Sequence, residues 1–228
     1  MNFYGFDNTY FLILIAMGIS MLAQRWVTST FNKYSEWQTS KAVTGKEAAE
    51  VILRAHNINN VTVEHTSGSL TDHYDPTNKV LRLSDATYDR TSVAAVAVAA
   101  HECGHALQDA DNYGFMRLRA GLVPIVNFTS RVSMPLIFIG FILGYAGLVN
   151  IGIIAFSAVL VFQLVTLPVE FNASNRAMKI LDGTILTQDE IAPAKKVLRA
   201  AAFTYVAAAL GTALQILRFV LLSRRRNN

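Results

Sequence analysis

Long runs of apolar residues without a charged side chain limit what this chain of 228 residues can fold into. Three of the runs are long enough to cross a bilayer as helices, and the first becomes so when Phe3, Tyr4 and Phe6 are included. Charged residues make up 16% of the sequence, against about 25% in an average soluble chain. The sequence therefore predicts a membrane protein with about four transmembrane helices, in residues 9–23, 132–149, 151–169 and 200–217.

The first run could also be the apolar part of a cleaved signal peptide. Such a peptide begins with a positively charged segment, and no Lys or Arg precedes Arg25. We therefore interpret the run as a transmembrane helix with its amino end outside.

The residues that follow the first run are polar and show two periodicities. Residues 45–58 have the apolar spacing of a helix, while residues 61–65 and 79–84 alternate like half-buried strands. Turns are expected between the strands, and the second strand, KVLRLS, is a candidate edge strand beside which an extended peptide could bind. These patterns predict an α+β domain.

A further helix follows these strands, with Asp89, Thr91 or Ser92 as its possible N-cap. Its apolar part, Val93–Ala100, is too short to cross a membrane. It is therefore predicted to be a buried core helix.

The second and third runs predict a transmembrane hairpin with a tight turn at Asn150. Such a hairpin returns the chain to the side from which it entered, so residues before Val132 and after Val169 lie on one side. Lys and Arg number eleven in residues 25–131 and five in residues 170–199. Positive charge favours the cytoplasmic side, which predicts a cytoplasmic polar domain in the cell membrane.

The motif that points to chemistry is His101-Glu102-Cys103-Gly104-His105. Residues four apart share one face of a helix, so the two imidazoles can hold one Zn²⁺ at about 2.0–2.1 Å each. Glu102 is turned about 100° from His101, near a water on the metal, where it can act as the general base. Cys103 is interpreted as a small buried thiol, and Gly104 as a position of close packing.

A catalytic zinc ion needs a third protein ligand, and two carboxylates are candidates. Asp111 lies six residues after His105, but Gln108 stands where a glycine would have to turn the chain back to the metal. Glu170 directly follows the hairpin and lies on the same side as the histidines. We favour Glu170, with Ser174 one turn further on as a supporting side chain.

Together, HECGH, the hairpin, EFNAS (170–174) and DHYDP…KVLRLS (72–84) resemble the bacterial membrane-bound neutral zinc metallopeptidases of the YugP type over nearly the whole chain. The resemblance implies a zinc-dependent endopeptidase with His101, His105 and Glu170 as ligands and Glu102 as general base. More distantly, the layout is similar to the HtpX and Ste24 membrane proteases, which have Asp where this chain has Ser174.

The sequence thus predicts a mostly helical α+β membrane protein with a zincin-like catalytic domain between its first and second transmembrane helices. The expected parts are a first transmembrane helix (1–25), the catalytic domain (26–131), the hairpin (132–169), the third-ligand segment (170–199) and a fourth transmembrane helix with a basic tail (200–228).

The expected activity is hydrolysis of peptide bonds in membrane or misfolded proteins, with Zn²⁺ as cofactor. The expected partners are a protein or peptide substrate and the lipid bilayer. A net charge of +4 without an aromatic and basic recognition motif argues against nucleic acid. His73 or Arg176 could stabilise an oxyanion, although a surface role is favoured for each.

Two other functions are open. One is a zinc-binding membrane scaffold without activity, against which Glu102 argues. The other is a transporter, against which the lack of ionisable residues in the apolar runs argues.

Overall fold

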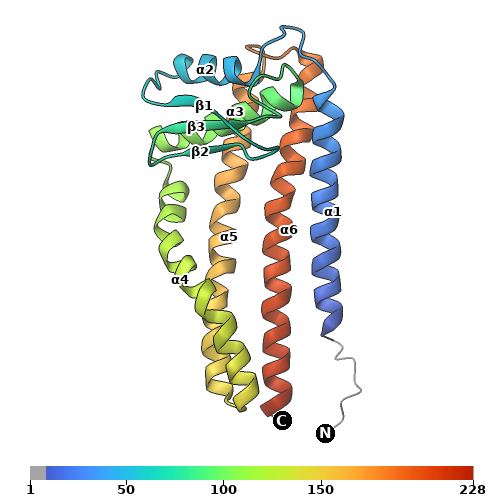
Figure 1. Ribbon diagram of the computed structural model, residues 1–228, viewed down its shortest axis with the longest axis vertical. Helices are drawn as coiled ribbons and strands as arrows, with labels where there is room; N and C mark the ends of the chain where they lie inside the picture. The colour runs from blue at the N-terminus through green and yellow to red at the C-terminus, as the bar shows by residue number, and fades with distance from the viewer. Residues whose placement is uncertain (1–8, 228) are drawn as a thin grey trace. The chain divides into compact units, whose positions relative to one another are not determined.

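The computed structural model describes residues 9–227, which form two compact units (Figure 1). Of the described residues, the helical unit consists of 9–24, Leu118–Leu167 and 204–227. The polar unit consists of Arg25–Arg117 and Pro168–Phe203. Four long helices contribute residues to both units: α1 (Tyr10–Ser35), α4 (Gly114–Leu143), α5 (Ala146–Leu181) and α6 (Gln188–Asn227).

The surface of the helical unit is apolar. Phe128, Ile142 and Ile154 are 68%, 80% and 73% exposed, and patches of this kind are rare on soluble monomers. Within residues 9–227, the four long helices are those with the length and hydropathy to cross a membrane. The prediction of about four transmembrane helices is confirmed; its use of Phe3, Tyr4 and Phe6 lies outside the described residues.

The hairpin between α4 and α5 is present, but the predicted position of its turn is wrong. The chain reverses at Gly144, whose φ of 73° is readily adopted by glycine. Asn150 instead lies inside α5, where its side-chain oxygen accepts a hydrogen bond from Ser223 Oγ at 3.3 Å. A polar side chain inside a transmembrane helix can find its partner on a neighbouring helix, so it does not have to mark a loop.

Two glycines let α4 and α5 approach closely. A Cβ added at Gly152 would lie 2.9 Å from both the Ile137 nitrogen and the Ser133 oxygen, and one at Gly140 would lie 2.8 Å from the Val149 nitrogen. These neighbours are backbone atoms, which cannot move aside by rotating a side chain. The hairpin therefore depends on glycine at both positions.

We predict that Gly152→Ala lowers the melting temperature of the detergent-solubilised protein by several degrees, because overpacking of this kind costs about 1–3 kcal/mol. Gly121→Ala is the control, since Gly121 lies in α4 of the same hairpin and its added Cβ would meet nothing within 4 Å. Equal melting temperatures for the two variants would contradict the close packing.

The polar unit contains a small mixed sheet. Its strands are β1 (Thr62–Thr66), β2 (His73–Asp75) and β3 (Val80–Ser84), in the order β1-β3-β2. β3 pairs parallel with β1 and antiparallel with β2. β1 and β3 confirm the two predicted strands, whereas β2 occupies a stretch that was expected to contain only turns. The expectation that KVLRLS is an edge strand is wrong, because β3 lies between β1 and β2. The sequence pattern of a strand does not show whether one or two strands pair with it, so the error could not be seen at that level.

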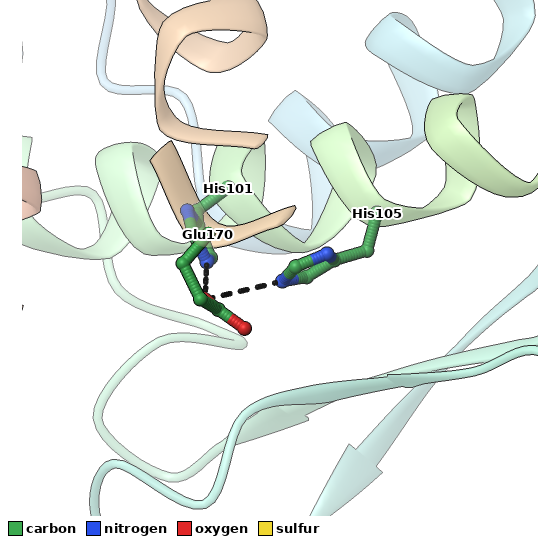
Figure 2. Close-up of side chains that lie close together, drawn as sticks. All are labelled: His101, His105 and Glu170. Atoms are coloured by element: carbon green, nitrogen blue, oxygen red, sulfur yellow. Dashed lines mark hydrogen bonds and ion pairs between the residues drawn. The ribbon is translucent and has the colours of Figure 1, made fainter. Parts of the chain in front are cut away.

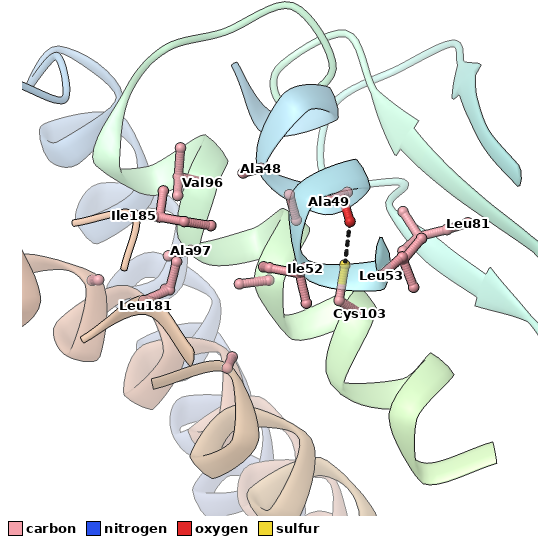
Figure 3. Close-up of a cluster of buried hydrophobic side chains, with 14 of the residues drawn as sticks. Ala48, Ala49, Ile52, Leu53, Leu81, Val96, Ala97, Cys103, Leu181 and Ile185 are labelled. Atoms are coloured by element: carbon pink, nitrogen blue, oxygen red, sulfur yellow. Dashed lines mark hydrogen bonds between the residues drawn. The ribbon is translucent and has the colours of Figure 1, made fainter. Parts of the chain in front are cut away.

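Two shorter helices cover the sheet and complete the core of this unit (Figure 3). The predicted helices are confirmed as α2 (Gly45–Ala55) and α3 (Val93–Ala110). Ser92 is the N-cap of α3, where its side chain accepts a hydrogen bond from the Ala95 nitrogen. The core consists of buried apolar residues from α2, β3, α3, the end of α5, the segment after it and the start of α6, including Ala49, Ile52, Leu53, Leu81, Leu83, Val96, Ala97, Cys103, Leu181, Ile185 and Leu198.

The structure therefore confirms a mostly helical α+β membrane protein. Helix α3 lies within the core of the polar unit, as its predicted role as a buried core helix requires. Its amino-terminal half consists almost entirely of fully buried Ala and Val side chains, and these fix its position before the chain reaches His101.

Candidate metal centre

Helix α3 presents His101 and His105 on one face, one helical turn apart. Their ring centroids lie 4.8 Å apart with the ring planes almost perpendicular. Figure 2 shows both imidazoles pointing toward the carboxylate of Glu170, which comes from α5. The expectation that residues on the two sides of the hairpin meet is thus confirmed for these three side chains.

The approach of α5 to α3 depends on Gly104. A Cβ added at Gly104 would lie 2.6 Å from the Ala173 oxygen and 3.0 Å from its Cα. Any larger residue would push the two helices apart. The predicted close-packing role of Gly104 is confirmed, and this crossing sets how near Glu170 comes to the histidines.

The distances suit a shared metal ion. Glu170 Oε2 lies 3.3 Å from His101 Nε2 and 3.6 Å from His105 Nε2. Two donors that are each about 2.0–2.1 Å from a tetrahedral zinc ion lie about 3.3–3.4 Å apart. One nitrogen or oxygen from each of the three residues lies within 4.8 Å of the others, so the three side chains could hold a metal without a large rearrangement.

Charge and burial around Glu170 also favour a bound cation. The side chain of Glu170 is only 3% exposed, and a buried carboxylate is costly unless a cation faces it. Burial alone would lower the pKa of His105, but the neighbouring Glu170 and Glu102 outweigh this effect and raise it above its ordinary value. The two histidines and Glu170 therefore form a site that favours positive charge.

A fully buried amide, Gln108, orients His105. Its Nε2 donates to the backbone oxygen of Val169 at 2.7 Å and to Asn172 Oδ1 at 3.0 Å. The amide oxygen must then face His105 Nδ1, at 3.0 Å, and can only accept a hydrogen bond from the N–H group there. This arrangement leaves His105 Nε2 free to face Glu170. The sequence interpretation missed this role, although Gln108 lies three residues after His105 and thus on a neighbouring part of the helix face.

The other imidazole has a similar outer contact. Ser174 Oγ lies 3.1 Å from His101 Nδ1, which leaves His101 Nε2 to face Glu170. A hydrogen bond of this kind to the second ring nitrogen is typical of histidines that bind metal. Ser174 thus lies where the sequence placed a supporting side chain.

Glu102 lies beside the two histidines without a partner of its own. It is only 8% exposed, and among residues 9–227 no hydrogen bond or ion pair engages its carboxylate. A nearly buried carboxylate without a partner is available to accept a proton.

The remaining candidates lie outside this cluster. Asp111 is the C-cap residue of α3, has a side chain that is 58% exposed, and pairs with Arg176. Exposed His73 uses its Nδ1 to contact the Thr71 oxygen. Cys103 is buried on another face of α3, with Sγ 3.7 Å from the Ala49 oxygen, and burial raises the pKa of its thiol. Its interpretation as a small buried thiol is confirmed.

Comparison with known proteins gives the family. A family model described as "Putative neutral zinc metallopeptidase" matches residues 9–224. The chain belongs to this family. The chain is also 49% identical over 215 residues to the "Putative membrane protease YugP" of Bacillus subtilis (strain 168). This match covers 93% of this chain and 95% of that protein. No solved structure matches the chain.

These matches confirm the resemblance to zinc metallopeptidases of the YugP type. The more distant resemblance to other membrane proteases stays a prediction.

We predict that Gly104→Ala loosens the crossing of α3 and α5 in this zinc metallopeptidase family member. Hydrogen exchange of the amides in residues 168–181 should become faster, because the new methyl group forces the two helices apart. Gly114→Ala, whose added Cβ would meet nothing within 4 Å, should leave this exchange unchanged. Unchanged exchange in Gly104→Ala would contradict the close crossing.

Proposed function

We propose that the protein is a membrane-embedded zinc endopeptidase. His101, His105 and Glu170 are the proposed zinc ligands, and Glu102 is the proposed general base. The observation that carries the proposal is the convergence of two imidazoles and a buried carboxylate beside a carboxylate with no partner. Membership in a zinc metallopeptidase family supports the same assignment.

The donor set fits zinc. Imidazole nitrogen and carboxylate oxygen are ligands that zinc accepts, and three protein ligands leave a fourth position for water or substrate. When bound, zinc would polarise the scissile carbonyl and acidify a water molecule. The contacts from Gln108 and Ser174 would hold both imidazoles with Nε2 toward the metal.

Glu102 supplies the proton transfers in this proposal. Its carboxylate takes one proton from the attacking water as the new bond forms between the water oxygen and the carbonyl carbon. Glu102 then delivers that proton to the amide nitrogen as the carbon–nitrogen bond breaks. The products are a carboxylic acid and an amine, and Glu102 is returned as a carboxylate.

The position of Glu170 suggests the substrate class. It directly follows the uncharged run 151–169 within the continuous helix α5. A ligand so close to an apolar segment supports action on membrane proteins, or on misfolded segments near the bilayer. We place the polar unit on the cytoplasmic side, because Lys and Arg gather in its segments.

The first test measures zinc content and cleavage of casein by the purified protein. We predict about one zinc per chain in the wild type and its loss in Glu170→Ala, because two imidazoles alone leave the site one ligand short. Glu102→Gln should keep the zinc and cleave about 10²–10⁴-fold more slowly, since it cannot accept the proton.

The control for this test is Asp111→Ala, which removes an exposed carboxylate of the same region. It should keep both zinc and activity. If Asp111→Ala loses the zinc instead, the proposed ligand set is wrong. If Glu102→Gln cleaves as fast as the wild type, the cleavage comes from a contaminating protease, and an inactive zinc-binding scaffold gains support.

A second test concerns Gln108. We predict that Gln108→Leu weakens zinc binding about 10–100-fold, because His105 loses the acceptor that fixes its orientation. The matched control is Asn175→Leu, which removes an exposed amide of α5 for which the structure gives no hydrogen bond. Competition with a chromophoric chelator measures both affinities, and equal losses in the two variants would contradict the role of Gln108.

A further inference from the structure

A groove of about 290 Å³ lies in the polar unit between α5 and α6. Its apolar lining comes from Phe171 and Met178 of α5 and from Leu198 and Ala202 of α6. The residues proposed for catalysis do not line it, so the groove is a separate feature. Its volume is near the lower end of the range for small-molecule pockets, which suits one end of a long ligand.

The rim of the groove is positively charged. Lys195 and Arg199 lie one helical turn apart on α6, and both are exposed. Within residues 9–227, neither has an ion pair or a hydrogen bond. The lining contains no acidic residue, so the two cations are available to an anion from outside.

The groove lies at the polar ends of two apolar segments. Arg199 directly precedes the uncharged run 200–217 of α6, and Phe171 comes two residues after the uncharged run 151–169 of α5. Nearby, Trp26 of α1 packs edge-on against Phe203, with ring centroids 5.3 Å apart. Lys, Arg and Trp are enriched where transmembrane helices meet lipid headgroups.

We propose that this groove binds the headgroup of an anionic phospholipid. The phosphate oxygens accept hydrogen bonds from Lys195 and Arg199, while the start of an acyl chain covers the exposed Phe171 and the half-buried Met178. A free phosphate ion would make no use of the apolar lining. The position at the ends of two apolar runs favours a ligand that comes from the bilayer.

The groove also reaches the metal centre through one side chain. Ser174 lines the groove, and its Oγ lies 3.1 Å from His101 Nδ1. A bound lipid would therefore lie next to the residue that orients His101. The binding itself does not depend on zinc or on proteolysis, and it can be measured without either.

The test is native mass spectrometry of the full chain in detergent with equal amounts of phosphatidylglycerol and phosphatidylcholine. The wild type should retain phosphatidylglycerol at least about fivefold more than phosphatidylcholine, since each Lys or Arg near an anionic headgroup contributes a few-fold in affinity. Lys195→Gln/Arg199→Gln should lose most of this preference.

The matched control is Lys179→Gln/Lys196→Gln, which removes two exposed cations of the same two helices outside the groove lining. It should retain the wild-type preference. Equal losses in both double variants would overturn the proposal in favour of general surface charge, and a wild type without any preference would also overturn it.

Two further experiments test whether the lipid occupies this groove. Asn175→Trp fills the lining without changing the charge and should also reduce phosphatidylglycerol retention; full retention would show that the lipid binds elsewhere. If inorganic phosphate displaces the lipid as well as soluble short-chain phosphatidylglycerol does, the groove is an anion site and the lipid assignment is wrong. Circular dichroism and size-exclusion chromatography check that each variant is folded.

Discussion

The buried carboxylate of Glu170 is the constraint that organises the polar unit. A carboxylate that is almost removed from water needs positive charge close by, and here two imidazoles from α3 lie within 3.3 and 3.6 Å of it. Bringing them together requires α5 to cross α3 at Gly104, where even a methyl group would meet the backbone of Ala173. The core around α3 and the buried amide of Gln108 then hold this arrangement in place.

The local elements were largely predictable because their patterns depend on near neighbours in the sequence. The apolar spacing of α2 follows from its one buried face, and the continuous apolar start of α3 follows from burial on nearly all sides. The expectation that the second predicted strand is half-buried is wrong, because both faces of β3 are covered. β2 was missed because three residues are too few to show an alternation. The position of the hairpin turn was also wrong, because Asn150 finds its partner, Ser223, on a helix far away in the sequence.

The meeting of His101 and His105 with Glu170 could be predicted, because a transmembrane hairpin returns the chain to the side it left. The role of Gln108 could not be predicted in this way. Its function depends on Val169 and Asn172, which lie more than 60 residues away along the chain. A contact of this kind follows from how two helices cross, and the pattern of a single helix does not contain it.

The central claim is that two imidazoles and one carboxylate bind a single zinc ion. X-ray absorption spectroscopy at the zinc edge of the zinc-loaded, detergent-purified protein tests it most directly. The account predicts four nitrogen or oxygen neighbours at about 2.0–2.1 Å, with the multiple-scattering signature of two imidazoles and no sulfur. A sulfur neighbour at about 2.3 Å, or a shell without imidazole, would contradict it, since the first requires Cys103 and the second excludes His101 and His105.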